Sequence, residues 1–217
     1  AIYNGYVYVI GGQTTSAEAT ATNTVMYARL KADGTIPTSG IGIWANTTAL
    51  SVSGTKNRSR HTVVASNGYM YVIGGTDETN TAQSTVYYAK INSDGTLGSW
   101  ASTSSLGAAR LAHGSFAANG YVYAVGGSST SSAANAVSTT YYARQNADGT
   151  LGTWATTQPI GGGTRVNRMG ASVVYANGYI YAIGGVDATS NYQSTVYYAK
   201  INADGTIPSS GSGVWAT

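Results

Sequence analysis

The chain has 217 residues, a formal net charge of +3 and 9% charged residues, whereas roughly 25% is usual in soluble domains. Its eleven lysines and arginines are scattered, and nucleic-acid binding needs a concentrated basic stripe, so we predict no nucleic-acid partner. The chain has no cysteine, which excludes disulfides, thiolate metal sites and a cysteine nucleophile. No apolar run approaches the roughly 18 residues of a membrane-spanning helix, so we predict no membrane insertion.

A nine-residue motif, Asn-Gly-Tyr-x-Tyr-x-x-Gly-Gly, occurs four times. Its copies span residues 4–12, 67–75, 119–127 and 177–185. Each copy is followed by a tyrosine-rich segment, an Asp-Gly-Thr turn and a tryptophan. A module this small cannot bury its own apolar face and must stack on its neighbours. We therefore predict one domain over residues 1–217, with repeat units of roughly 1–50, 51–106, 107–160 and 161–217.

The second repeat gives the clearest strand pattern. A short strand is expected within residues 58–66, and Asn67-Gly68 is a strong hairpin signal because both residues accept a positive φ. The next strand alternates, so that Tyr71 and Val72 point to opposite faces. Both faces are apolar, which indicates a strand between two neighbouring sheets.

Two further strands complete this repeat. Residues 85–91 form the third strand, Asp94-Gly95 turns the chain, and Trp100 opens a fourth strand that runs toward Leu106. The unit is thus a four-stranded antiparallel meander. Equivalent third strands are expected at residues 24–30, 139–145 and 195–201.

The strand count is uneven at the two ends. The first repeat begins at its second strand, and the last repeat ends as its fourth strand begins at Trp215. Fifteen strands are therefore expected, one short of four full units. An open sheet edge invites pairing with another chain. We expect the natural protein to be longer; the alternative is a partner, or a second copy by self-association, that supplies the strand.

These features resemble the kelch motif of β-propellers. A hydrophobic strand closed by Gly-Gly is followed in each repeat by a tyrosine and a tryptophan, and Arg-x-x-His occurs at Arg58–His61 and Arg110–His113. The segment from Tyr88 to Trp100 is longer than the usual kelch hairpin, which indicates a divergent, bacterial-type extracellular subgroup. The resemblance implies an all-β propeller of four-stranded antiparallel blades, about four in this chain, with the first blade lacking its first strand.

The two rims of such a propeller differ in sequence. The Asn-Gly and Asp-Gly-Thr turns share one rim and are nearly identical in all repeats, whereas the other connections vary in length and composition. Uniform turns serve geometry and individual loops serve recognition, so the variable rim is the predicted binding face. Its second-to-third-strand loops are residues 13–23, 76–84, 128–138 and 186–194, and its fourth-to-first-strand loops include residues 51–59, 106–111 and 160–167.

Three arginines recur at one repeat position of this rim, namely Arg58, Arg110 and Arg168. If the first strand lines the central channel, they form part of a ring around its mouth. Guanidinium forks there suit an anionic group such as a carboxylate sugar or a phosphate. The alternative, implied by the family resemblance, is that each arginine binds carbonyl groups of the adjacent blade and locks the blades together.

The remaining candidates have a structural alternative of their own. His61 and His113 share a repeat position, and buried hydrogen bonding suits them better than a two-histidine metal site. Asp77 and Asp187 each follow a Gly-Gly pair, where capping of the loop is favoured over calcium binding. Tyr192 lies in a variable loop and could stack on a sugar ring. We predict no metal and no cofactor.

The favoured function is a non-catalytic, secreted or cell-surface bacterial propeller that binds glycan or protein through its variable loops. A glycosidase needs two carboxylates about 5–10 Å apart, and no such pair recurs in the repeats, so no catalytic residue is assigned. One alternative is a sialidase-like glycoside hydrolase that uses the arginine cluster. Another is a structural subunit of a surface assembly.

Overall fold

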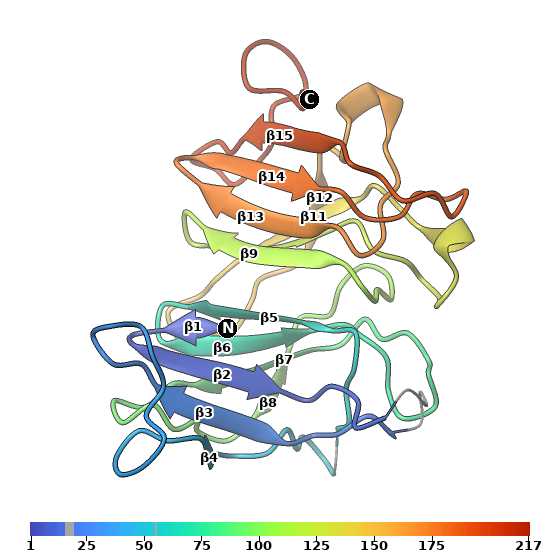
Figure 1. Cartoon of the computed structure of the whole chain (residues 1–217). Helices are drawn as coiled ribbons and strands as arrows, with labels where there is room; N and C mark the ends of the chain where they lie inside the picture. The colour runs from blue at the N-terminus through green and yellow to red at the C-terminus, as the bar shows by residue number, and fades with distance from the viewer. Residues whose placement is uncertain (16–19, 55) are drawn as a thin grey trace.

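The computed structural model describes residues 1–15, 20–54 and 56–217. Within these residues fifteen strands form four antiparallel sheets, and in each sheet the strands lie side by side in chain order. Successive sheets meet most closely at their first strands, β1 with β5, β5 with β9 and β9 with β13. The sheets are the blades of a β-propeller (Figure 1), which confirms the predicted fold.

The strands of each blade are as follows. Blade 1 contains β1 (Ile2–Tyr3), β2 (Tyr6–Ile10), β3 (Val25–Arg29) and β4 (Ala45–Asn46). Blade 2 contains β5 (Thr62–Ser66), β6 (Tyr69–Ile73), β7 (Val86–Lys90) and β8 (Ala101–Thr103). Blade 3 contains β9 (Gly114–Ala118), β10 (Tyr121–Val125), β11 (Thr140–Arg144) and β12 (Ala155–Thr157). Blade 4 contains β13 (Ser172–Ala176), β14 (Tyr179–Ile183) and β15 (Val196–Lys200).

The Asn-Gly turns set the register of every blade. Asn67 and Gly68 have φ values of 46° and 81°, as a two-residue type I′ hairpin requires. The turn pairs Ser66 with Tyr69 and so places Tyr71 opposite Val64. Because side chains alternate along a strand, this register decides which residues face each neighbouring blade.

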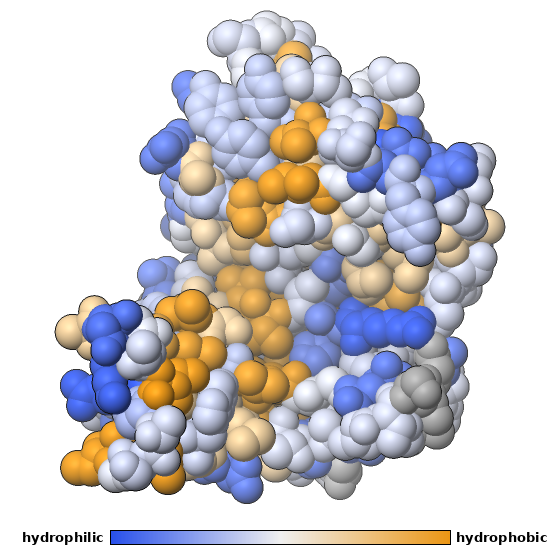
Figure 2. Space-filling model, viewed as in Figure 1, coloured by the Kyte–Doolittle hydropathy of each residue, from blue (hydrophilic) through white to orange (hydrophobic). Residues whose placement is uncertain are grey.

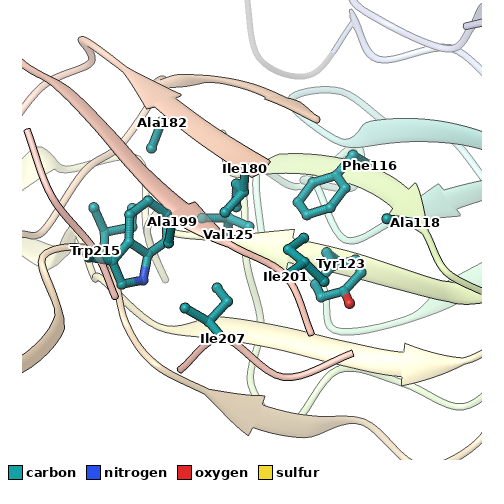
Figure 3. Packing of buried hydrophobic residues seen from close by; sticks show 11 residues of the cluster. Phe116, Ala118, Tyr123, Val125, Ile180, Ala182, Ala199, Ile201, Ile207 and Trp215 are labelled. Carbon is teal, nitrogen blue, oxygen red and sulfur yellow. The ribbon is translucent and has the colours of Figure 1, made fainter. Parts of the chain in front are cut away.

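Three apolar clusters hold consecutive blades together. Val72 belongs to the cluster between blades 1 and 2, and Tyr71 belongs to the cluster between blades 2 and 3. This confirms the alternation predicted for a strand with two apolar faces. Figure 3 shows the third cluster, where Phe116 stacks on Tyr123 with ring centroids 4.4 Å apart and Trp215 of blade 4 lies in the same core.

The prediction that blade 1 lacks its first strand is wrong. Ile2 pairs with Val7, and Tyr3 pairs with Tyr6. The Asn-Gly turn of the first repeat is complete, so the two residues before it form a short strand. The incomplete sheet is that of blade 4, where a single bridge between Tyr198 and Ala216 stands in place of a fourth strand.

The fourth strands are shorter than expected. β8 ends at Thr103, whereas the sequence predicts a strand toward Leu106. The Leu106 side chain is buried in the cluster between blades 2 and 3, and its N–H donates to the Ser84 carbonyl. The chain therefore leaves the sheet to bury this leucine. Within the described residues no helix is long and apolar enough to cross a membrane.

Candidate functional site

The rim that carries the Asp-Gly-Thr turns is built for geometry. The Asp94 carboxylate accepts hydrogen bonds from the Thr96 N–H at 3.0 Å and from the Thr96 hydroxyl at 2.6 Å. These bonds lower the pKa of Asp94. The turns that begin at Asp33, Asp148 and Asp204 have the same two bonds. The carboxylates of this rim are thus used to fix the turns.

Two loops of the opposite rim contain the same set of internal hydrogen bonds to an aspartate, which we call the aspartate frame. In loop 76–83 the Asp77 carboxylate accepts from the N–H groups of Thr79 and Thr81 and, at 2.7 Å, from the Gln83 side chain. In loop 186–193 Asp187 accepts in the same way from Thr189, Asn191 and Gln193. A hydrogen bond from the Thr189 hydroxyl and further backbone bonds lower the pKa of Asp187. Both aspartates therefore organise the loops that contain them, and their part in ligand binding stays a prediction.

The two frames present different side chains to solvent. The antiparallel bridge that joins Thr76 to Ala82 corresponds to the one that joins Val186 to Tyr192. An alanine in one loop thus stands where the other loop has a tyrosine, and Tyr192 is 91% exposed. The rim carries a solvent-exposed aromatic ring on a loop whose backbone is fixed from within.

The other loops of this rim differ from that frame. Loop 128–138 contains a 3-10 helix, η2 (Ala133–Asn135), whose first turn is capped by the Ser132 hydroxyl. The connection from blade 3 to blade 4 contains another, η3 (Gly162–Thr164). Residues 16–19 and residue 55, within the predicted loops 13–23 and 51–59, lie outside the described residues.

The three predicted arginines lie inside the protein. Arg58, Arg110 and Arg168 are 4 to 5% exposed. Each guanidinium donates to the carbonyl of the preceding residue at 2.8–2.9 Å. Each also lies 5.3–5.7 Å from the ring centre of a tyrosine in its own blade, a favourable cation–π arrangement. The Nε atoms have no hydrogen-bond partner among the described residues.

The arginine backbone links successive blades. The Arg110 carbonyl accepts from the Gly75 N–H at 2.7 Å, and the Arg110 N–H donates to the Gln83 carbonyl. The equivalent bonds recur at Arg58 and Arg168. The blades are thus joined here by main-chain groups, whereas the side chains bind within their own blade. A role of the guanidiniums in ligand binding stays a prediction.

The two histidines lie at the first two blade junctions. His113 is buried, and its Nε2 lies 2.7 Å from the hydroxyl of Thr62 in blade 2. Burial lowers the pKa of His113 to about 3 and that of His61 to about 4. Both imidazoles are therefore neutral at pH 7. The equivalent residue in blade 4 is Ala171.

Three recurring threonines that link successive blades were not predicted from the sequence. The Thr103 hydroxyl of blade 2 accepts a hydrogen bond from the Leu151 N–H of blade 3 at 2.7 Å. Thr47 and Thr157 make the same contact with the blade that follows them. Each of these threonines is the third residue after a repeat tryptophan, and that fixed spacing was the available signal.

A pocket of about 560 Å³ lies outside the variable rim. It is lined by Arg29, Lys31, Pro37 and Ile41 among others, around the turn between β3 and β4 of blade 1. Ile41 is 92% exposed. The connection from β3 to β4, residues 30–44, is longer than the equivalent connection in blade 2, residues 91–100, and the pocket lies in the first blade of the array.

Comparisons with known proteins agree with this architecture. The kelch motif matches residues 57–88 and 167–198. A solved structure described as "Structure of YjhT" superimposes with a TM-score of 0.70 at 11% identity, over 96% of this chain and 66% of that one. The chain thus spans about two thirds of that structure's length. No curated protein sequence matches. These findings support a kelch-like repeat family for this chain, whose repeats are the blades of a β-propeller.

Proposed function

We propose that this protein is a non-catalytic, secreted or cell-surface module that binds a glycan through the variable rim. The kelch propeller fold is suited to a binding or interaction role. The observation that supports this proposal most is the Tyr192 ring, which is 91% exposed on a loop held by Asp187. Large exposed aromatic side chains on rigid loops mark recognition surfaces more often than stability elements.

The loop chemistry favours a sugar as the ligand. A tyrosine ring offers an apolar face to a sugar ring and a hydroxyl at its edge. Its neighbours in the loop are the neutral residues Ala188, Thr189, Ser190 and Asn191. Because the loop is already ordered by the four hydrogen bonds to Asp187, little backbone entropy is lost on binding.

The arrangement of acids and arginines argues against the hydrolase alternative. A sialidase-like mechanism needs guanidiniums that reach the carboxylate of a substrate, and here Arg58, Arg110 and Arg168 are buried. The carboxylates of Asp77 and Asp187 are engaged within their loops. These three arginines and two aspartates are therefore unavailable for a sialidase-like reaction.

The test is a glycan array followed by calorimetry on the strongest hits. Tyr192→Ala should weaken binding at least about fivefold, because loss of one stacking ring is worth about 1–3 kcal/mol. Tyr192→Phe should keep most of the affinity, because the ring is retained. Glu78→Ala, an exposed substitution in loop 76–83, is the matched control and should leave the affinity unchanged. None of these three substitutions should change the melting temperature, because all of them lie at exposed positions.

Two outcomes would overturn this proposal. One is glycan binding that Tyr192→Ala leaves unchanged. The other is an array without hits together with a purified protein partner whose affinity depends on Tyr192. Turnover of fluorogenic glycosides by the wild-type protein would instead support the hydrolase alternative.

A further inference from the structure

The two ends of the blade array expose apolar sheet faces. We call the side of blade 1 that points away from blade 2 the leading face, defined by Val9, Met26 and Trp44. The side of blade 4 that points away from blade 3 is the trailing face, defined by Val174, Ile183, Val196 and Tyr198. In Figure 2 apolar residues gather over blade 4 in the upper part and over blade 1 in the lower part, on either side of a hollow.

The trailing face has the side chains that an inner blade packs against the next blade, but here no next blade is present among the described residues. Ile183 and Val196 are each 40% exposed, whereas their counterparts in blade 2, Ile73 and Val86, are fully buried. Ile183 pairs with Val196 across the sheet as Ile73 pairs with Val86. The same side chains in the same register thus differ in exposure because blade 2 has a following blade and blade 4 has none.

The leading face shows the complementary half. Val9 is 50% exposed, and its counterpart Val72 is 1% exposed. Trp44 is 38% exposed, whereas the other three repeat tryptophans are 6 to 8% exposed. In the inner blades this tryptophan donates to a carbonyl of the preceding blade, as Trp100 does to Thr48 at 2.9 Å. The leading face therefore matches the side that an inner blade turns to its predecessor.

The two faces do not cover each other. Between the described residues no hydrogen bond joins blade 4 to blade 1. The Tyr71 hydroxyl of blade 2 donates to the Gly149 carbonyl of the next blade at 2.7 Å, and Tyr181 is its counterpart on the trailing face. The counterpart of Gly149 on the leading face is Gly34, and between the described residues no tyrosine hydroxyl donates to the Gly34 carbonyl. Each face carries half of an interface that occurs three times inside the molecule.

We propose that the leading and trailing faces dock a segment of two further kelch-like blades, which completes a ring with this chain. The kind of partner follows from continuity with the three existing junctions: its first blade must present the tryptophan side and its second blade the tyrosine side. Contiguous apolar faces of this kind mark interaction surfaces rather than solvated ones.

The number of blades follows from the size of the structural neighbour. Because 96% of the 217 residues correspond to 66% of that structure, its uncovered third amounts to about 107 residues. The spacing from Asp94 to Asp148 is 54 residues, so this length corresponds to two repeats. A second copy of this chain would not fit, because it has four blades and the gap in the ring has room for two.

The test extends the full chain with its own blades. A six-blade chain joins residues 1–216 to a second copy of residues 102–217, which keeps the Trp-Ala-Ser sequence of an inner junction. We expect its melting temperature to exceed that of the 217-residue chain by roughly 10 °C or more. Fluorescence of an apolar dye such as bis-ANS should fall several-fold, because both faces are covered. A five-blade chain, residues 1–216 followed by 156–217, leaves the ring open and should keep the dye binding.

Aspartate substitutions show where the added blades dock. In the 217-residue chain Val9→Asp and Ile183→Asp lie on exposed faces and should shift the melting temperature by about 2 °C or less. In the six-blade chain each should lower it by roughly 10 °C, because the carboxylate is then buried in a junction. Leu111→Asp, at a site that is buried in both chains, should destabilise both and serves as the control.

Three results would overturn this inference. The first is a six-blade chain with no rise in melting temperature and unchanged dye binding. The second is aspartate variants that behave alike in both chains. The third is dimerisation of the 217-residue chain at micromolar concentration, measured by sedimentation velocity, with loss of dye binding, because a second copy would then cover the faces.

Discussion

The junction between blades 2 and 3 and the trailing face of blade 4 have almost the same sequence but different physical surroundings. Tyr71 and Gly74 of blade 2 touch the next blade, and their counterparts Tyr181 and Gly184 have no next blade to touch. The comparison teaches that the kelch motif encodes an interface rather than a self-contained blade. A residue of the motif contributes fully to the stability of the protein only when a neighbouring blade is present.

The largest difference is expected at the first glycine of the Gly-Gly pair. Gly74 and Gly184 have φ values of 59° and 64°, so alanine costs about 1 kcal/mol at either position. A Cβ at Gly74 would lie 2.5 Å from the Arg110 carbonyl oxygen of blade 3, whereas at Gly184 the nearest atom is the Gln193 carbonyl oxygen at 3.1 Å. Separating two packed backbones adds roughly 2 kcal/mol for Gly74→Ala.

Urea denaturation of the two alanine variants measures this difference. We expect Gly74→Ala to lower the free energy of unfolding by about 3 kcal/mol and Gly184→Ala by about 1 kcal/mol. Equal losses would mean that backbone conformation alone sets the requirement for glycine and that the close approach of the next blade does not.

Acid should weaken the first two junctions, because they contain His61 and His113. Their pKa values in the folded protein, about 4 and about 3 because of burial, lie below the ordinary value of 6.5. The unfolded chain therefore binds more protons than the folded one below pH 6.5, and stability is lost as the pH falls from 6.5 toward 4. The loss at pH 4.5 is about 2.5 kcal/mol for each histidine.

The matched variant is His113→Ala, which copies the residue found in blade 4 at Ala171. It should be less stable than the wild type at pH 7, but its melting temperature should fall less between pH 6.5 and 4.5. The turn aspartates have lowered pKa values and titrate below this window. A variant that keeps the full pH dependence would show that His113 is not its source.

Most of the fold could be predicted from the sequence, because the strands and turns of each repeat are determined by residues close together in the chain. Asn67-Gly68 sets a hairpin, alternation around Tyr71 sets two apolar faces, and Asp94-Gly95 closes the third strand. These signals act over a few residues, so one sequence reveals them. The short strand Ile2–Tyr3 was missed because two residues carry no alternation to detect.

The candidate site was harder to predict because burial is a long-range property. The position of Arg110 in the repeat was clear, but its enclosure by Tyr141 and by the main chain of the preceding blade depends on packing. Tyr192 was singled out by its place in a variable loop, and its full exposure follows from a frame of side-chain bonds to Asp187 that no pattern of hydrophobicity reports.

The smallest effect, and the most direct test of the comparison, concerns a single hydroxyl group. Tyr71→Phe removes a donor to the buried Gly149 carbonyl and should lower the free energy of unfolding by about 1–2 kcal/mol. Tyr181→Phe should change it by less than about 0.5 kcal/mol, because no next blade supplies an acceptor. In the six-blade chain the same Tyr181→Phe substitution should cost as much as Tyr71→Phe does. An unchanged cost there would mean that the added blade does not pack on blade 4 as blade 3 packs on blade 2.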